Sequence, residues 1–257
     1  MLVATDFDGT LAPIVARPED ALPLPGAVAA LAALAQRRDL RVAIVSGRAL
    51  SDLRARCLVP GCWYVGGHGN ETSSGAPGGD LGEAPASPRD PQLRRELARR
   101  AEELRQRMPS WPGARLEAKP YSLAVHFRQA PQWAESIRQA FSALAAPGGF
   151  RVLLGRQVVE LLPEGALTKG HAVQRLRTRL GCDLAFYFGD DVTDEDVFRL
   201  RHPDIIGVKV EHAEAAEATA ADFRLASPQA VEAALEAIER LRPLEQKKNV
   251  LFDTVPP

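Results

Sequence analysis

Short apolar runs alternate with amphipathic helical stretches along most of the chain, and this pattern predicts strands that alternate with helices. The runs expected to form buried strands are 1–5, 41–45, 63–66, 184–188 and 205–209. The stretches expected to form helices are 27–37, 50–57, 169–179, 194–200 and 228–241. Such alternation is typical of a parallel sheet wrapped by helices, so the predicted fold class is α/β with a Rossmann-like parallel-sheet core.

The alternation is interrupted between residues 75 and 163. Residues 75–91 are rich in Gly, Pro, Ala and Ser, a composition that favours a flexible connection. The pattern then predicts a helix at 92–107, strands at 115–119 and 121–128, a helix at 131–144, and a hairpin at 150–154 and 157–161. This αββαββ order predicts an antiparallel sheet with helices on one face. We call residues 75–163 the cap, and residues 1–74 with 164–257 the core; residues 247–257 resemble a tail.

Composition excludes several classes of protein. The 257 residues are 46% apolar, enough for at least one well-buried core. With 32 basic and 33 acidic residues the net charge is −1, so no general field favours nucleic acid or an anionic membrane. There is no leader-like start and no apolar run that could span a bilayer, so a location in the cytoplasm is expected. A monomer is also expected. The 3 cysteines show neither disulfide nor zinc-site spacing.

Two aspartates follow the first predicted strand. Asp6 and Asp8 are two positions apart, and residues two apart on a strand share a face, so both can point beyond its carboxyl end. In an open α/β sheet ligands bind at that edge. Three other polar clusters belong to the same framework: 46–48 (SGR), 169–170 (KG) and 189–195 (GDDVTDE). Each cluster alone also has a plain structural explanation as a turn, a helix cap or an acidic helix start.

Together and in this order, D-x-D-G-T, SGR, KG and GDDVTDE resemble the haloacid dehalogenase superfamily of phosphohydrolases. The resemblance implies that Asp6 attacks phosphorus to form an aspartyl-phosphate, and that Asp8 is the general acid and base. Hydrolysis needs both roles, because a sugar alkoxide leaves poorly unless it is protonated. A divalent cation must also offset the repulsion between carboxylates and a phosphate dianion, and oxygen ligands favour Mg²⁺.

The same resemblance implies how the remaining residues of these motifs are used. The Mg²⁺ ligands would be Asp6, the backbone carbonyl of Asp8, and Asp190. Asp191 and Asp194 would lie next to these ligands without binding the ion directly. The catalytic Lys169 would supply positive charge to the phosphoryl group in the transition state. The rest of the phosphate site would consist of Thr10, Ser46, the amide of Gly47, and Arg48.

Selectivity for one phosphate ester must come from the cap. Glu117 and Lys119 share one face of their strand, and polar and apolar residues alternate through 123–128. A solvated sheet face is the plain explanation of such alternation. Binding of hydroxyl groups is favoured here, because the polar face mixes acceptors with donors and Glu160 adds an acceptor on the last strand.

The cap sequence narrows the resemblance. The patterns E-x-K-P-x-S-x-A-x-H-F-R at 117–128 and V-V-E-L-L-P at 158–163, with the following KG and GDDVTDE, resemble trehalose-6-phosphate phosphatases over residues 1–240. That family implies a mobile cap that closes over a small sugar phosphate. Glu117, Lys119 and Glu160 would bind its hydroxyls, with contributions from His126 and Arg128. The GHGNE segment at 67–71 departs from the usual sequence pattern of that family. His68 is therefore either a structural loop histidine or a ligand, and the role of Asn70 is open.

The expected function is therefore Mg²⁺-dependent hydrolysis of trehalose 6-phosphate. A rival is another sugar phosphatase on the same scaffold, acting on sucrose 6-phosphate or a glycosyl-3-phosphoglycerate, because exchanged pocket hydrogen bonds change selectivity. A hypothesis from a different class is a catalytically silent sugar-phosphate sensor. The presence of Asp6, Asp8, Lys169 and Asp190 argues for the enzyme.

Overall fold

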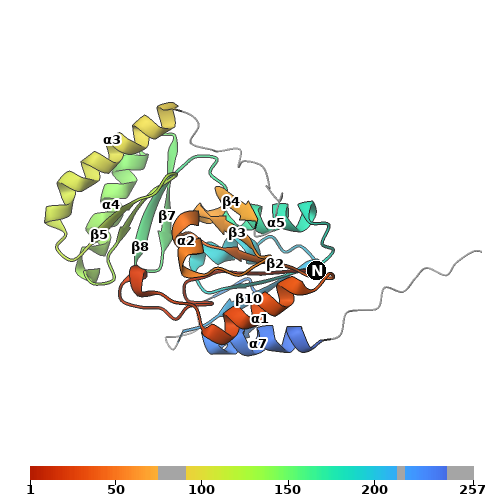
Figure 1. Cartoon of the computed structure of the whole chain (residues 1–257). Helices are drawn as coiled ribbons and strands as arrows, with labels where there is room; N and C mark the ends of the chain where they lie inside the picture. The colour runs from red at the N-terminus through yellow and green to blue at the C-terminus, as the bar shows by residue number, and fades with distance from the viewer. Residues whose placement is uncertain (75–90, 213–217, 242–257) are drawn as a thin grey trace, which may run out of the picture.

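A computed structural model describes residues 1–74, 91–212 and 218–241, and it shows two sheets, each with its own helices (Figure 1). The larger sheet belongs to the core and the smaller one to the cap. The linker predicted at 75–91 lies outside the described residues except for Pro91, and the tail predicted at 247–257 lies wholly outside them. The domain boundaries drawn from the sequence therefore stay predictions.

The core sheet has seven strands in the order β11-β10-β9-β1-β2-β3-β4. Neighbouring strands are parallel, except that β4 runs antiparallel to β3 at one edge. The strands are β1 (Leu2–Thr5), β2 (Arg41–Val45), β3 (Trp63–Gly66), β4 (Glu71–Ser74), β9 (Ala185–Gly189), β10 (Ile205–Val210) and β11 (Phe223–Leu225). Strand β1 is central, so its carboxyl end opens into the middle of the ligand-binding edge.

Helices cover both faces of the core sheet, which explains the continuous apolar strands. In β1, Val3 packs in the cluster formed with α1 (Pro25–Gln36), α2 (Leu50–Arg56) and α7 (Pro228–Arg240). Leu2 and Ala4 point to the other side, into the cluster formed with α5 (Lys169–Arg179) and α6 (Glu195–Phe198). Strands buried on both faces favour apolar residues at successive positions, as at Leu2, Val3 and Ala4.

The cap contains an αββαββ unit, as predicted. Its antiparallel sheet has the order β5-β6-β8-β7. The apolar residues Val125, Val159 and Leu161 pack against the two cap helices, which lie on the face of the sheet turned away from the core (Figure 1). The elements are α3 (Pro91–Arg107), β5 (Arg115–Ala118), β6 (Leu123–His126), α4 (Ala134–Ala145), β7 (Phe150–Gly155) and β8 (Val158–Pro163).

The structure adds elements that the sequence pattern did not predict. Strands β4 and β11 lie at the two edges of the core sheet. A short 3-10 helix at 131–133 takes the place of the expected first turn of α4, and another at 192–194 directly precedes α6. Further 3-10 helices are Pro18–Asp20, Gly67–Gly69 and Met108–Ser110.

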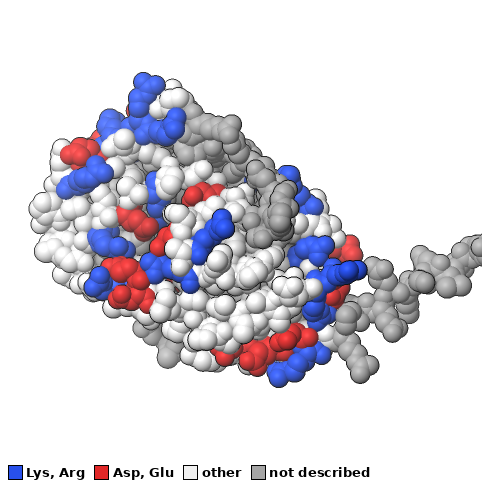
Figure 2. Space-filling view, viewed as in Figure 1, with Lys and Arg blue, Asp and Glu red and all other residues white. Residues whose placement is uncertain are grey.

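No helix within the described parts of the chain is long and apolar enough to cross a membrane. Figure 2 shows acidic and basic side chains interspersed on the face where the cap meets the core. Neither sign of charge dominates that face, in keeping with the net charge of −1. Any recognition of an anion must therefore come from local arrangements of side chains.

Candidate active site

A cavity of about 720 Å³ lies between the carboxyl edge of the core sheet and the polar face of the cap sheet. Most of the predicted site residues line it together: Asp6, Asp8, Ser46, Gly47, Arg48, Glu117, Lys119, His126, Arg128, Glu160, Lys169, Asp190 and Asp191. Two others are buried behind the wall. Asp194 is 0% exposed, and so is Thr10, whose hydroxyl has no hydrogen-bond partner among the described residues. Residues far apart in the sequence thus meet in one site.

Asp6 and Lys169 form a buried ion pair at the core side of this cavity. Asp6 directly follows β1, and its backbone N–H donates to the carbonyl of Phe188 at 2.8 Å, which fixes it to β9. Nζ of Lys169 lies 3.0 Å from Oδ2 of Asp6 and 2.8 Å from Oδ1 of Asp194. Burial, reinforced by Asp194 and Asp190, raises the pKa of Asp6 well above its usual range, although Lys169 opposes this shift. The lysine therefore supplies the charge that offsets the crowded carboxylates.

Lys169 and Asp194 are each held by their local structure. Lys169 is the first residue of α5, and the side chain of Thr168 caps this helix by accepting from the N–H of His171. Oδ2 of Asp194 accepts from the N–H groups of Asp190 at 3.0 Å and Asp191 at 2.9 Å. Its Oδ1 also accepts from the hydroxyl of Tyr187. With both oxygens engaged, Asp194 orients Lys169 and the turn after β9.

Asp190 has the features of a cation ligand. Carboxylate oxygens of Asp6, Asp190 and Asp194 lie within 4.8 Å of one another. Oδ2 of Asp190 accepts from Nε2 of His212 at 2.9 Å, whereas its Oδ1 is buried without a partner among the described residues. A buried carboxylate oxygen that lacks a partner is costly, and a hard cation with oxygen ligands would satisfy it. These residues therefore fit Mg²⁺.

Gly9 allows the Asp190 carboxylate to approach the loop after β1. Its backbone has φ +75°, a conformation that favours glycine. A Cβ atom at this position would lie 2.1 Å from Oδ2 of Asp190, much closer than van der Waals contact. The glycine of the D-x-D-G-T motif thus serves both the turn and the carboxylate cluster.

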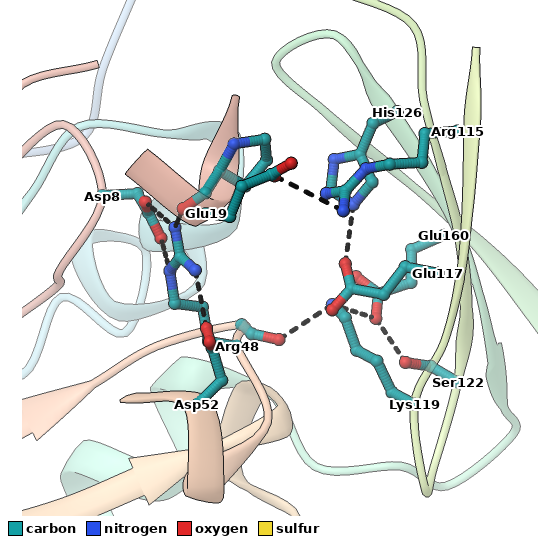
Figure 3. Close-up of polar contacts among 12 residues, drawn as sticks. Asp8, Glu19, Arg48, Asp52, Arg115, Glu117, Lys119, Ser122, His126 and Glu160 are labelled. Atoms are coloured by element: carbon teal, nitrogen blue, oxygen red, sulfur yellow. Dashed lines mark hydrogen bonds and ion pairs between the residues drawn. The ribbon is translucent and has the colours of Figure 1, made fainter. Parts of the chain in front are cut away.

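Arg48, which the sequence predicts to bind phosphate, is paired with two carboxylates. Its Nε lies 2.6 Å from Oδ2 of Asp8, and its Nη2 lies 2.7 Å from Oδ1. Its Nη1 donates to Asp52 at 2.6 Å, and Asp52 also accepts from Arg56. In Figure 3, Arg48 lies on the core side between Asp8 and Asp52. The sequence reasoning assigned Arg48 to the phosphate and overlooked Asp52 and Arg56, although their i, i+4 spacing is a sign of such pairs.

The segment that follows β2, residues 46–48, contacts the cap through a hydrogen bond. Ser46 is buried, and its Oγ accepts from the N–H of Arg48 at 3.2 Å. The carbonyl of Gly47 accepts from Nζ of Lys119, a cap residue, at 2.9 Å. The sugar-binding lysine predicted from the sequence thus contacts the loop predicted to bind phosphate.

Glu160 is the centre of a charged cluster on the cap side. It is 4% exposed and accepts from Lys119 at 3.0 Å and from Ser122 (Figure 3). It also accepts from His68 at 2.9 Å. Burial opposes its ionisation, but Lys119 and His68 outweigh this effect, and the pKa of Glu160 lies far below its usual range. The pKa of Lys119 is raised, because Glu160 and Glu117 together outweigh the effect of burial. Glu160 and Lys119 therefore form a buried ion pair.

The remaining predicted cap residues also have defined partners. Nε2 of His126 lies 2.7 Å from Oε2 of Glu117, and the pair faces the cavity (Figure 3). Burial opposes ionisation of Glu117, but His126 and Lys119 prevail and lower its pKa. Nη1 of Arg128 donates to the carbonyl of Val15 in the core at 3.0 Å. The cap and core thus contact each other on several sides of the cavity.

Several residues of the site were not assigned by the sequence reasoning. Arg115 pairs with Glu19 across the cavity mouth at 3.5 Å. The backbone N–H of Arg156, in the turn between β7 and β8, donates to Oδ1 of Asp191 at 3.1 Å. His212 contacts Asp190 from beyond β10. No motif marks these residues, because each acts through a tertiary contact between distant segments.

The two residues of the GHGNE segment with open roles have different surroundings. Asn70 donates to the carbonyls of Gly67 and Leu167 and accepts from the N–H of Leu167. It therefore fixes this loop to the segment that leads into α5. His68 lines the cavity and contacts Glu160.

Comparison with solved structures finds the same fold in two known phosphatases. The C. albicans trehalose-6-phosphate phosphatase C-terminal domain superposes with a TM-score of 0.79 at 22% identity, over 94% of this chain and 92% of that one. A sucrose-phosphatase from Synechocystis, solved with sucrose and phosphate, gives a TM-score of 0.56 at 20% identity, over 93% of this chain and 96% of that one. At these identities the likeness concerns the fold alone.

Sequence comparison then identifies the family. The trehalose-phosphatase family model matches residues 4–229. The trehalose-phosphate phosphatase of Mycobacterium marinum is 39% identical over 232 residues, which are 87% of this chain and 57% of that protein. The chain thus spans a little over half the length of this curated relative. It belongs to the trehalose-phosphatase family.

Proposed function

We propose that this chain hydrolyses trehalose 6-phosphate to trehalose and phosphate through an aspartyl-phosphate on Asp6. The observation that carries the proposal is one shared cavity, in which the Asp6–Lys169 pair of the core and polar side chains of the cap both line the wall. Membership of the trehalose-phosphatase family supports the same substrate. On the cap side the sugar hydroxyls would meet Glu117, Lys119 and Glu160, with His126 and Arg128 beside them.

The first step would transfer the phosphoryl group to the protein. A carboxylate oxygen of Asp6 attacks phosphorus as the bond to the sugar oxygen breaks, and Asp8 donates a proton to the leaving oxygen. Nζ of Lys169, the hydroxyl of Ser46 and the N–H of Gly47 offset the negative charge on the phosphoryl oxygens. The bidentate contact with Arg48 fixes the orientation of the Asp8 carboxylate.

The second step would regenerate the carboxylate. Water attacks the phosphorus of the aspartyl-phosphate while Asp8 accepts its proton, and phosphate leaves as the P–O bond to Asp6 breaks. Closure of the cap over the cavity limits the access of bulk water to the acyl phosphate. The proton that Asp8 gives in the first step is thus recovered in the second.

Mg²⁺ would be held by Asp6, Asp190 through its unpartnered Oδ1, and the backbone carbonyl of Asp8, and when bound it would supply charge neutralisation at the phosphate. Asp194 and Asp191 would keep these groups in place, because Asp194 accepts from the N–H groups of Asp190 and Asp191. The location in the cytoplasm and the monomeric state expected from the sequence stay predictions.

The experiment that tests this function is phosphate release from a panel of sugar phosphates. We expect trehalose 6-phosphate to have the highest kcat/KM with Mg²⁺, and we expect EDTA to abolish turnover. Asp6→Asn, which keeps the shape of the side chain, should remove activity, whereas Asp204→Asn, outside the cavity lining, should retain it. A preference for sucrose 6-phosphate or a glycosyl-3-phosphoglycerate would overturn the assigned sugar. Binding without turnover in the unaltered chain would indicate a sensor.

A further inference from the structure

His68 has a backbone conformation that is unusual for its residue type. It has φ 58° and ψ 20°, in the left-handed region that L residues with a side chain rarely adopt. Two backbone hydrogen bonds hold the segment in this shape: His68 N–H donates to the carbonyl of Ser46 at 3.0 Å, and Gly67 N–H donates to that of Arg48 at 2.7 Å. Glycine would adopt this conformation at a lower free-energy cost. A role for the imidazole side chain would explain why a histidine is found here.

The imidazole of His68 lies between the core loop and the cap. A Cβ atom on Gly47 would lie 2.5 Å from Cε1 of the ring, so only a glycine at position 47 leaves room for it. On its other side, Nε2 of the ring lies 2.9 Å from Oε2 of Glu160. His68 is 7% exposed, and its Nδ1 has no partner among the described residues. Among the described residues, the hydrogen bond with Glu160 is therefore the only one that the His68 ring makes.

The two oxygens of Glu160 are both linked to the segment that precedes α2. Oε2 accepts from His68, whose backbone is bonded to Ser46. Oε1 accepts from Lys119 at 3.0 Å, and the same ammonium group donates to the carbonyl of Gly47 at 2.9 Å. His68 and Lys119 thus link this cap carboxylate to the loop predicted to bind phosphate, while Ser122 of the cap also donates to Oε1.

We propose that His68 is a positioning residue, which orients Glu160 and, through it, Lys119, so that the sugar is bound in register with the reacting phosphate. The inference rests on the proposed function, because it takes Glu160 and Lys119 as the groups that meet the sugar. It assigns a task to a histidine that the motifs leave unexplained. Fixing a binding group through a neighbouring hydrogen bond is a common way to preorganise a site.

The first test compares two substrates. Trehalose 6-phosphate reaches the cap residues, whereas p-nitrophenyl phosphate has no sugar hydroxyls to offer them. We expect His68→Ala to lower kcat/KM for the sugar phosphate at least tenfold more than for the aryl phosphate, mainly through KM. Equal loss on both substrates would mean that His68 merely supports the phosphate loop, and would overturn the proposal.

Conservative replacement provides a second readout. His68→Gln keeps an N–H donor, and the chain already holds Gln157 in the same backbone region, at φ 61°. We expect His68→Gln to recover much of the selectivity that His68→Ala loses. His202→Ala serves as a control, because His202 pairs with Asp204 and does not line the cavity. Circular dichroism and Tm should show that all variants are folded; equal selectivity of the Gln and Ala variants would contradict the proposal.

A double-mutant cycle tests the route through Glu160. If His68 acts by orienting Glu160, His68→Ala in a Glu160→Ala background should cost less than threefold in kcat/KM for trehalose 6-phosphate. Additive losses would show that the two residues act independently. Calorimetric titration of Asp6→Asn protein with trehalose 6-phosphate and Mg²⁺ gives a readout without turnover. In the Asp6→Asn background, His68→Ala should weaken the binding of trehalose 6-phosphate about tenfold. An unchanged affinity would overturn the proposal even if the chain proves to be no phosphatase.

Discussion

The guanidinium group of Arg48 donates to both carboxylate oxygens of Asp8, at 2.6 and 2.7 Å. The two residues are 40 positions apart, and each follows a parallel strand of the core sheet. A planar fork of two N–H groups matches a carboxylate in one orientation only. The residue proposed to move protons is therefore held at a fixed angle over the cavity.

Substitution of Arg48 by Lys should impair catalysis although the charge is kept. An ammonium group cannot make the bidentate contact, so the Asp8 carboxylate would lose its fixed orientation. We expect kcat to fall by about ten- to a hundredfold, in line with the usual contribution of proton transfer. Steady-state kinetics would measure this, with Arg54→Lys in the following helix α2 as the control, because Arg54 does not line the cavity. An effect on KM alone would instead favour direct binding of phosphate by Arg48.

Loss of the His212 side chain should weaken the binding of Mg²⁺. His212 donates to Oδ2 of Asp190 at 2.9 Å and leaves Oδ1 for the cation. Residues that orient a metal ligand commonly contribute about tenfold or more to affinity. We expect His212→Ala to raise the Kd for Mg²⁺ about tenfold in calorimetric titrations, and His212→Gln to raise it less. A Kd that both variants leave unchanged would show that Asp190 needs no such support.

Two glycine substitutions separate backbone strain from crowding. Gly9 and Gly165 have similar φ values, +75° and +79°, but only Gly9 has close neighbours that a Cβ would meet. Gly165→Ala should cost about 1 kcal/mol of unfolding free energy from the backbone conformation. Gly9→Ala should cost more, and it should also weaken Mg²⁺ binding by displacing Asp190. Urea unfolding and metal titration would measure both effects, and equal losses of stability would contradict the role of the close contact.

The ion pair of Lys119 with Glu160 predicts a pH-dependent stability. The folded-state pKa of Glu160 lies below the ordinary value of 4.5, so the pair contributes stability above about that pH. This contribution is lost as the pH falls through the folded-state pKa. Lys119→Met should therefore destabilise the chain by about 3 kcal/mol at pH 7, because it removes the ammonium group that offsets the buried charge of Glu160. The difference from the unaltered chain should shrink below pH 4.5.

Urea unfolding of both proteins at pH 7 and pH 4 checks this pH dependence. The double variant Lys119→Met/Glu160→Gln is the matched control, because it removes the buried charge together with its partner. We expect it to be more stable at pH 7 than Lys119→Met alone. A loss in Lys119→Met that stays constant with pH would point to lost packing instead of charge.

The repeating parts of the fold could be predicted from the sequence. Strands such as β1 and β2 are buried on both faces and have continuous apolar runs, and α5 has a capping residue at Thr168. The edge strand β4 was missed, because its sequence ETSS has no apolar alternation and it is defined only by pairing with β3. Strand β11 has 3 residues, too few for a periodic signal.

The site could be predicted as a set of residues but not as a set of pairings. The motifs placed Asp6, Lys169 and Asp190 at one edge of the sheet, and all three line the same cavity. They did not reveal that Arg48 binds Asp8, or that His68 contacts Glu160, which is 92 positions away. Such contacts depend on how the cap lies on the core, and no local pattern encodes that arrangement.

The hydrogen bond between His68 and Glu160 limits how this scaffold can be redesigned. The groups proposed to bind the sugar and the groups proposed to cleave the ester belong to different domains, which suggests chimeras in which another cap is joined to this core. A graft that replaces β8 would also replace Glu160, the partner of His68, with a residue of the incoming strand. Transplants of this kind should therefore succeed only when position 68 and the incoming strand are exchanged as a matched set.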